Sequence, residues 1–174
     1  IHDSGDPEVC GTSGVSVQEG ARIVLSDARL ERICGLGIKV ADEGSEGDLD
    51  SVAITDVGAS GTAELGIAFL SYGGASTVAR DLTIERAALS GMLILGEGTH
   101  VELDGAAVLD TDPSGLEVAF DDPRARGIEL NGGARLVASD LRIERSAGLG
   151  LLVVDVGTSV SLQDTQIRGG WNPN

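Results

Sequence analysis

Six glycines open the same short phrase along this chain, and they recur after 24, 30, 24, 35 and 24 residues. An internal repeat of this length is typical of proteins in which structural units stack on one another, contact only their neighbours and share one long core. The repeat therefore constrains the architecture more than any other feature does. The glycines are Gly20, Gly44, Gly74, Gly98, Gly133 and Gly157.

Aligning the phrases gives columns of similar residues. The first position after each glycine is always small, which suits a tight corner next to a glycine. The fifth and tenth positions are always apolar, which predicts two ladders of core residues. The fifth-position residues are Leu25, Leu49, Ala79, Leu103, Ala138 and Leu162, and the tenth-position residues are Leu30, Ile54, Ile84, Val108, Ile143 and Ile167.

Within each unit, short apolar runs such as residues 23–25 and 36–40 are rich in β-branched residues and are broken by glycine. This pattern predicts short strands and little helix. Three short strands per unit can complete their hydrogen bonds only by lying beside the matching strands of the next unit, about 4.8 Å away. We therefore predict an all-β fold: a single-stranded parallel β-helix (solenoid) of about six to seven turns, with three short strands per turn.

The phrase Gly-small-x-apolar-x-apolar-x-Asp, followed by apolar-x-apolar, resembles the right-handed parallel β-helix proteins. That family includes pectate-lyase-like enzymes and many secreted bacterial repeat proteins. The resemblance covers nearly the whole chain and implies a right-handed coil. It identifies a fold and not an activity.

A charge pattern with a longer period overlies the repeat. Alternate units carry a Glu-Arg pair, and the units between them carry aspartate where the arginine would be. Stacking brings these opposite charges together at about one strand spacing. We interpret this ladder as structural, because exposed ion pairs contribute only about 0–1 kcal/mol each but help to set register. The ladder residues are Arg32, Asp56, Arg86, Asp110 and Arg145.

The formal net charge of −16 argues against binding to nucleic acid or to acidic membrane surfaces. The sequence contains no run of 18 apolar residues, which is the pattern that would predict insertion into a membrane. Residues 1–174 are predicted to form one β-helix domain, with loop insertions at 56–64 and 110–126 where units exceed 24 residues. We expect the chain to be a segment of a longer solenoid, or to stack end to end with further β-helix turns.

Cys10 and Cys34 are separated by one unit of 24 residues. Adjacent turns would bring them within the Cα separation of roughly 4.4–6.8 Å that a disulfide requires. A bridge would indicate an oxidising compartment. The alternative is two reduced cysteines that pack as small apolar residues.

The second insertion contains a calcium-loop spacing of oxygen ligands around a glycine. Its candidate ligands are Asp110, Asp112, Ser114 and Asp121. Pro113 inside the loop and aspartate at the last position depart from that pattern, so the alternative is a solvated acidic loop. No cofactor is required by the fold, and calcium is the one candidate metal.

No catalytic residue is predicted. His2 and His100 lie far apart in the repeat, and aromatic residues, on which sugar-binding grooves rely, make up only 2% of the chain. We therefore predict a non-enzymatic structural or adhesive β-helix module of a secreted or cell-surface bacterial protein, presenting its loops to a polysaccharide or another surface protein. The alternative is a fragment of a polysaccharide-acting β-helix enzyme, a lyase or a hydrolase.

Overall fold

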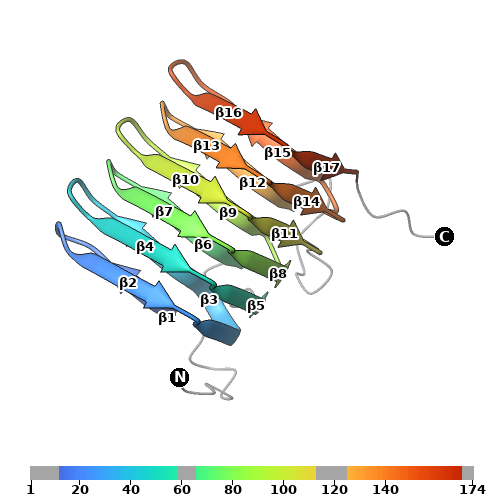
Figure 1. Cartoon of the computed structure of the whole chain (residues 1–174), viewed down its shortest axis with the longest axis horizontal. Helices are drawn as coiled ribbons and strands as arrows, with labels where there is room; N and C mark the ends of the chain where they lie inside the picture. Colours follow the sequence, from blue (N-terminus) through green and yellow to red (C-terminus); the bar gives the residue numbers. More distant parts are fainter. Residues whose placement is uncertain (1–11, 59–65, 113–124, 170–174) are drawn as a thin grey trace.

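The computed structural model describes residues 12–58, 66–112 and 125–169, and all the secondary structure in these ranges is β-strand (Figure 1). The strands group into six units of three strand segments, at residues 12–34, 35–58, 67–87, 90–109, 126–144 and 149–168. The strands are β1 (Thr12–Val17), β2 (Arg22–Ser26), β3 (Arg29–Ala41), β4 (Glu46–Asp50), β5 (Ala53–Gly58), β6 (Ile67–Tyr72), β7 (Ser76–Arg80), β8 (Thr83–Ala87), β9 (Ser90–Leu95), β10 (His100–Asp104), β11 (Ala107–Leu109), β12 (Arg126–Asn131), β13 (Arg135–Ser139), β14 (Arg142–Glu144), β15 (Leu149–Val153), β16 (Ser159–Gln163) and β17 (Gln166–Arg168).

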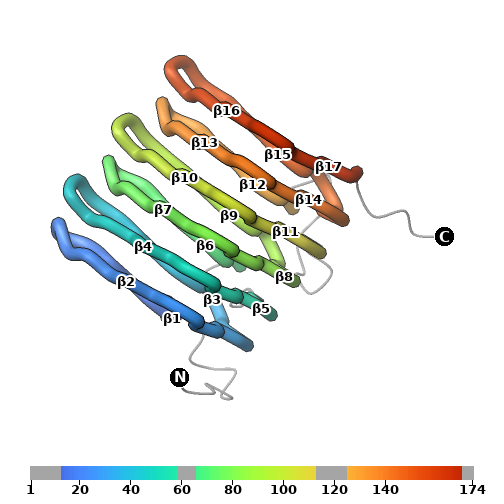
Figure 2. The backbone as a smooth tube through the Cα atoms, viewed as in Figure 1, coloured from blue at the N-terminus to red at the C-terminus, as the bar shows by residue number. Residues whose placement is uncertain are grey.

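Every strand pair in the described residues is parallel and joins matching strands of neighbouring units. One sheet has six strands, in the order β16-β13-β10-β7-β4-β2. The other has eleven strands and two arms that meet at β3. Arm 1 contains β1, β3, β6, β9, β12 and β15, and arm 2 contains β3, β5, β8, β11, β14 and β17. The backbone thus forms a solenoid-like stack (Figure 2).

The two predicted apolar ladders are present in register. The fifth-position ladder is formed by pairs such as Leu25 with Leu49 and Leu103 with Ala138, and the tenth by pairs such as Ile54 with Ile84. Most of these side chains belong to a single core cluster. In the sixth unit the ladders are exposed, since Leu162 is 38% and Ile167 46% accessible.

The strands extend further into the predicted insertions than expected. Residues 56–58 belong to β5, where Val57 pairs with Ala87, and Arg126 begins β12. Residues 59–65 and 113–124 lie outside the described residues. Between the first and second units, β3 continues round a corner without any loop.

The corners between strands depend on left-handed backbone conformations. The middle corner of each unit carries a residue of φ between 48° and 69°, which is aspartate, serine or glycine. Glycine adopts that conformation without steric cost, and aspartate is one of the few other residue types that visit it, so Ser51 is the exception among the six. The middle-corner residues are Asp27, Ser51, Asp81, Gly105, Asp140 and Asp164.

A hydroxyl group ties each odd unit to the even unit that follows it. The backbone N–H of Gly74 donates to Oγ1 of Thr99 at 3.0 Å, and Gly133 donates to Thr158 at 2.9 Å. Gly20 donates in the same way to Oγ of Ser45 at 3.1 Å. The small residues that follow the repeat glycines therefore include three hydrogen-bonding caps.

We predict that Thr99→Val lowers the free energy of unfolding by about 1–3 kcal/mol, because it leaves the partly buried N–H of Gly74 without its partner. Thr99 also donates to the carbonyl of Leu95 at 2.7 Å. The measurement is urea unfolding followed by circular dichroism.

Thr77→Val is the matched control. Thr77 is equally buried, but its hydroxyl has no hydrogen-bond partner among the residues that the structure describes. Replacing it with a methyl group should be neutral or stabilising. Equal losses in the two variants would contradict the role assigned to Thr99.

Candidate functional site

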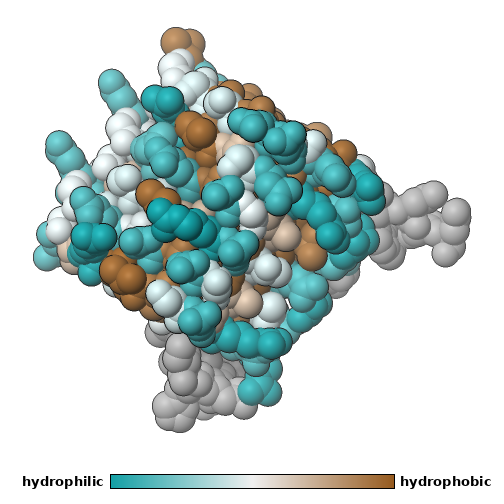
Figure 3. Space-filling view, in the orientation of Figure 1, coloured by the Kyte–Doolittle hydropathy of each residue, from teal (hydrophilic) through white to brown (hydrophobic). Residues whose placement is uncertain are grey.

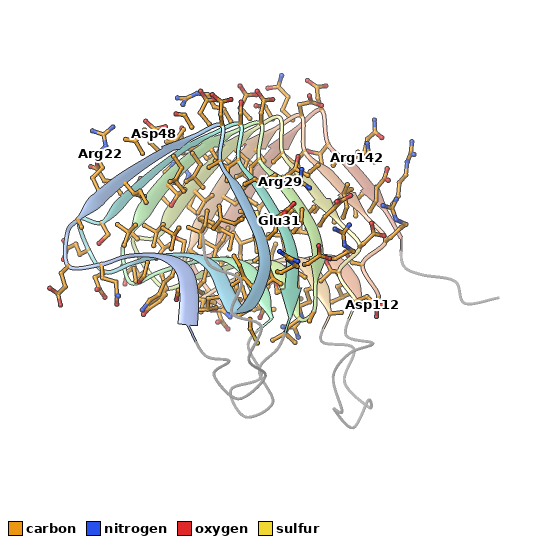
Figure 4. The ribbon with its side chains drawn as sticks, turned by 90° about the horizontal axis from the view of Figure 1, so that it is seen from below. Arg22, Arg29, Glu31, Asp48, Asp112 and Arg142 are labelled. Atoms are coloured by element: carbon orange, nitrogen blue, oxygen red, sulfur yellow. The ribbon has the colours of Figure 1, made fainter. Side chains whose placement is uncertain are left out.

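A pocket of about 500 Å³ lies where the strands of arm 2 end. It spans the second to fifth units, and its lining contains three aspartates and two arginines beside small apolar residues. Figure 4 shows Asp112 near this corner of the stack, while Arg22 and Asp48 extend outward on another side. The lining residues are Asp56, Val57, Gly58, Arg86, Ala88, Asp110, Asp112 and Arg145.

The first ion pair in the pocket joins the second and third units. Arg86, on β8, donates from Nε to Oδ1 of Asp56 at 2.5 Å and from Nη2 to Oδ2 at 3.0 Å. Its Nη1 donates to Oε2 of Glu85 at 3.0 Å. The guanidinium is therefore held in a fixed plane by two carboxylates.

The second ion pair repeats this geometry between the fourth and fifth units. Arg145 donates from Nε and Nη2 to the two carboxylate oxygens of Asp110, at 2.5 and 2.7 Å, and from Nη1 to Glu144 at 3.1 Å. Glu144 is only 7% exposed and also accepts from Arg142. The pocket thus has two matching bidentate pairs, two strand spacings or about 10 Å apart.

The arginines shift the pKa of both aspartates downward. Hydrogen bonds from Arg86 hold the pKa of Asp56 below its ordinary value of 3.8, and Arg145 does the same for Asp110. Each pairing raises the pKa of the arginine as well. Both aspartates are therefore ionised at neutral pH and cannot serve as proton donors there.

All five predicted ladder residues have left-handed backbones, with φ from 52° to 58°. This conformation costs about 1–2 kcal/mol for a residue that is not glycine. Arg32 adds to the positive field at Asp56, and Arg86 and Arg145 make the bidentate contacts in the pocket. The sequence predicted the alternation of sign, and it did not reveal the backbone conformation, because arginine is not a residue that favours it.

The predicted calcium ligands are only partly described. Asp110 and Asp112 line the pocket, and both oxygens of Asp110 accept hydrogen bonds from Arg145. Ser114 and Asp121 lie outside the described residues. No group of three metal-binding side chains occurs in the described ranges. The calcium site stays a prediction.

The cysteine prediction is also only partly described. Cys34 lies in β3 and is disulfide-bonded, whereas Cys10 lies outside the described residues. The pairing of Cys10 with Cys34 therefore stays a prediction.

No family model matches the chain, and comparisons with curated proteins and with solved structures gave no match. Within the described ranges, there is no helix that could cross a membrane. The fold and the pocket therefore carry the functional argument.

We predict that the double variant Asp56→Asn/Asp110→Asn is less stable than the wild type at pH 7, and that the difference shrinks on acidification. A folded-state pKa below 3.8 means that the ion pairs contribute above that pH and are lost as pH falls through the lowered pKa. Asparagine tolerates the left-handed backbone, so the corner is preserved. The measurement is the melting temperature from pH 7 to pH 3.

The charge-matched control is Asp81→Asn/Asp140→Asn. These aspartates are also left-handed, and no arginine hydrogen bond to their carboxylates occurs in the described part of the chain. A pH dependence that is the same in both double variants would contradict the assigned role of the pocket pairs.

Proposed function

We propose that this chain is a non-enzymatic structural or adhesive module built as a single right-handed parallel β-helix, one coil per unit. Parallel strands joined by crossovers are almost always right-handed, which supports the hand. The solenoid-like stack, the in-register apolar ladders and the resemblance of the repeat phrase support a β-helix of the kind found in secreted bacterial proteins.

The observation that carries the adhesive role is the pocket with its two bidentate arginine–aspartate pairs. The first residues of both insertions, 56–58 with Asp110 and Asp112, line it, and loops on a rigid scaffold are common places for binding. The carboxylates and the guanidiniums offer acceptors and donors to a ligand rich in hydroxyl groups, such as a polysaccharide, or to another surface protein. The guanidinium groups of Arg86 and Arg145 are already held in place by carboxylates, so less side-chain conformational entropy would be lost when a ligand binds.

The proposed location is extracellular or at the cell surface. The disulfide-bonded state of Cys34 supports it, because disulfides persist in oxidising compartments. The proposal includes end-to-end stacking with further β-helix turns, which the exposed apolar side chains of Leu162 and Ile167 favour. The proposal includes neither binding to nucleic acid nor insertion into a membrane.

The test is binding to an array of immobilised polysaccharides, together with assays for new reducing ends and unsaturated products. We expect binding without turnover, and we expect Arg86→Ala and Arg145→Ala each to weaken it roughly tenfold, the loss of about one charge-assisted hydrogen bond. Arg22→Ala, an exposed arginine on the six-stranded sheet, is the matched control.

Turnover of any polysaccharide would favour the alternative, a polysaccharide-acting β-helix enzyme. Binding that is unchanged in both arginine variants would show that the adhesive surface lies outside the pocket. A proteinaceous ligand would show as retention of a surface protein with no signal on the array.

Calcium is proposed as an accessory ion of the second insertion. If the ion binds through Asp110, it must compete with Arg145 for the carboxylate oxygens. We expect millimolar calcium to raise the melting temperature of the wild type but not of Asp112→Asn. No shift in the wild type would remove calcium from the proposal.

A further inference from the structure

Three arginines from two units surround the carboxylate of Glu144, on β14. Arg142 donates to it from Nε and from Nη2, both at 3.1 Å, and Arg145 donates from Nη1 at 3.1 Å. From the next unit, Nη1 of Arg168, on β17, lies 3.4 Å from Oε1 of the same carboxylate. Ile143 is fully buried, so alternation directs its two neighbours to the outer face of arm 2. We call the three arginines and Glu144 the arginine cluster.

The arginine cluster holds more positive than negative charge. Its three guanidiniums face the central carboxylate of the cluster and, through Arg145, the carboxylate of Asp110. One positive charge is therefore left unbalanced. In the third unit the balance is the opposite, because Arg86 faces two carboxylates, those of Glu85 and Asp56. In a chain of net charge −16, the cluster is a local reversal of sign.

The guanidiniums, and not the central carboxylate, are what solvent reaches. The side chains of Arg142 and Arg168 are 51% and 71% exposed, whereas that of Glu144 is 9% exposed. Each guanidinium has five N–H donors, and within the described residues Arg168 uses only its Nη1 group. Glu144 is a positioning residue, because it holds together three groups whose like charges repel. The surface over β14 and β17 is largely hydrophilic (Figure 3).

The arginine cluster is continuous with the pocket, because Arg145 belongs to both. Its Nε and Nη2 groups hold Asp110 in the pocket lining, and its Nη1 group holds Glu144 in the cluster. A ligand that occupies the pocket can therefore extend onto the cluster. One end of that ligand would then meet an excess of N–H donors and positive charge.

We propose that the arginine cluster binds an oxyanion group, a sulfate ester or a carboxylate, of the ligand held in the pocket. The identity of that ligand rests on the polysaccharide binding proposed above. Guanidiniums donate paired hydrogen bonds to such groups, and a single sulfate ester or carboxylate carries the charge that balances the cluster. The overall charge of −16 repels a densely charged polymer. The ligand class is therefore a largely neutral polysaccharide with isolated anionic groups.

The first measurement uses inorganic sulfate alone. It is titrated against chloride at matched ionic strength, and the arginine side-chain N–H resonances are followed by NMR. We expect saturable shifts in the wild type, and binding weakened roughly tenfold or more in Arg142→Gln and in Arg168→Gln, because each loses a charge-assisted hydrogen bond. Arg29→Gln, on the same arm in the first unit and paired with Glu31, is the matched control. Circular dichroism checks folding.

The second measurement adds lightly sulfated and lightly carboxymethylated forms of each neutral polysaccharide to the array. We expect at least one modified form to bind more tightly than its parent, and this gain to disappear in Arg142→Gln/Arg168→Gln but not in Arg29→Gln. Whether the sulfated or the carboxymethylated form gains more identifies the group that the cluster prefers.

If sulfate causes no saturable shift in the wild type, or the same shift in the double variant, the arginine cluster is not an oxyanion site. Equal binding of modified and parent polysaccharides would overturn the ligand class and leave the pocket proposal standing. Sulfate binding at the cluster without binding to any polysaccharide would contradict the proposed function and leave the oxyanion site standing.

Discussion

The hydrogen bonds between matching parallel strands are the interaction on which the rest of this structure depends. No strand in the described residues has a partner within its own unit, so each unit satisfies its backbone groups only through its neighbours. That requirement fixes the register, and a shift of one residue would turn the apolar side chains of a unit outward. The core, the corners and the charge ladder all follow from this one alignment.

The alignment explains which parts of the structure the sequence could predict. The ladders through Leu49 and Ile54 were predictable because a core column requires an apolar residue in every unit, and such a column is visible without coordinates. The left-handed backbones of Arg86 and Arg145 were not, because backbone conformation at a corner depends on the strands on both sides. The caps at Thr99 and Thr158 could have been inferred from the alternation of alanine with hydroxyl residues in one column.

The left-handed arginines also bear on the pocket. Glycine would adopt this conformation without the steric cost, and Gly157 and Gly133 do so at another corner. Arginine at such a position costs stability that the exposed ion pair offsets only in part. Strained residues tend to occur where a structure serves a function. The strain at Arg86 and Arg145 is therefore consistent with a binding pocket as well as with a register device.

The contacts between neighbouring units alternate between two kinds, so they repeat every two units along the chain. The hydroxyl caps join odd units to the even units after them, as Gly74 to Thr99, whereas the bidentate ion pairs join even units to the next odd ones, as Asp56 to Arg86. Both insertions fall at the even-to-odd steps, and each begins at a ladder aspartate, Asp56 or Asp110. A long connection weakens the covalent restraint on register there, and the arginine of the returning unit restores that restraint by binding the aspartate from which the chain departed. An insertion at an odd-to-even step would weaken the link between a cap and its glycine with no ion pair to replace it, which explains why both insertions occur at the steps that carry the bidentate pairs.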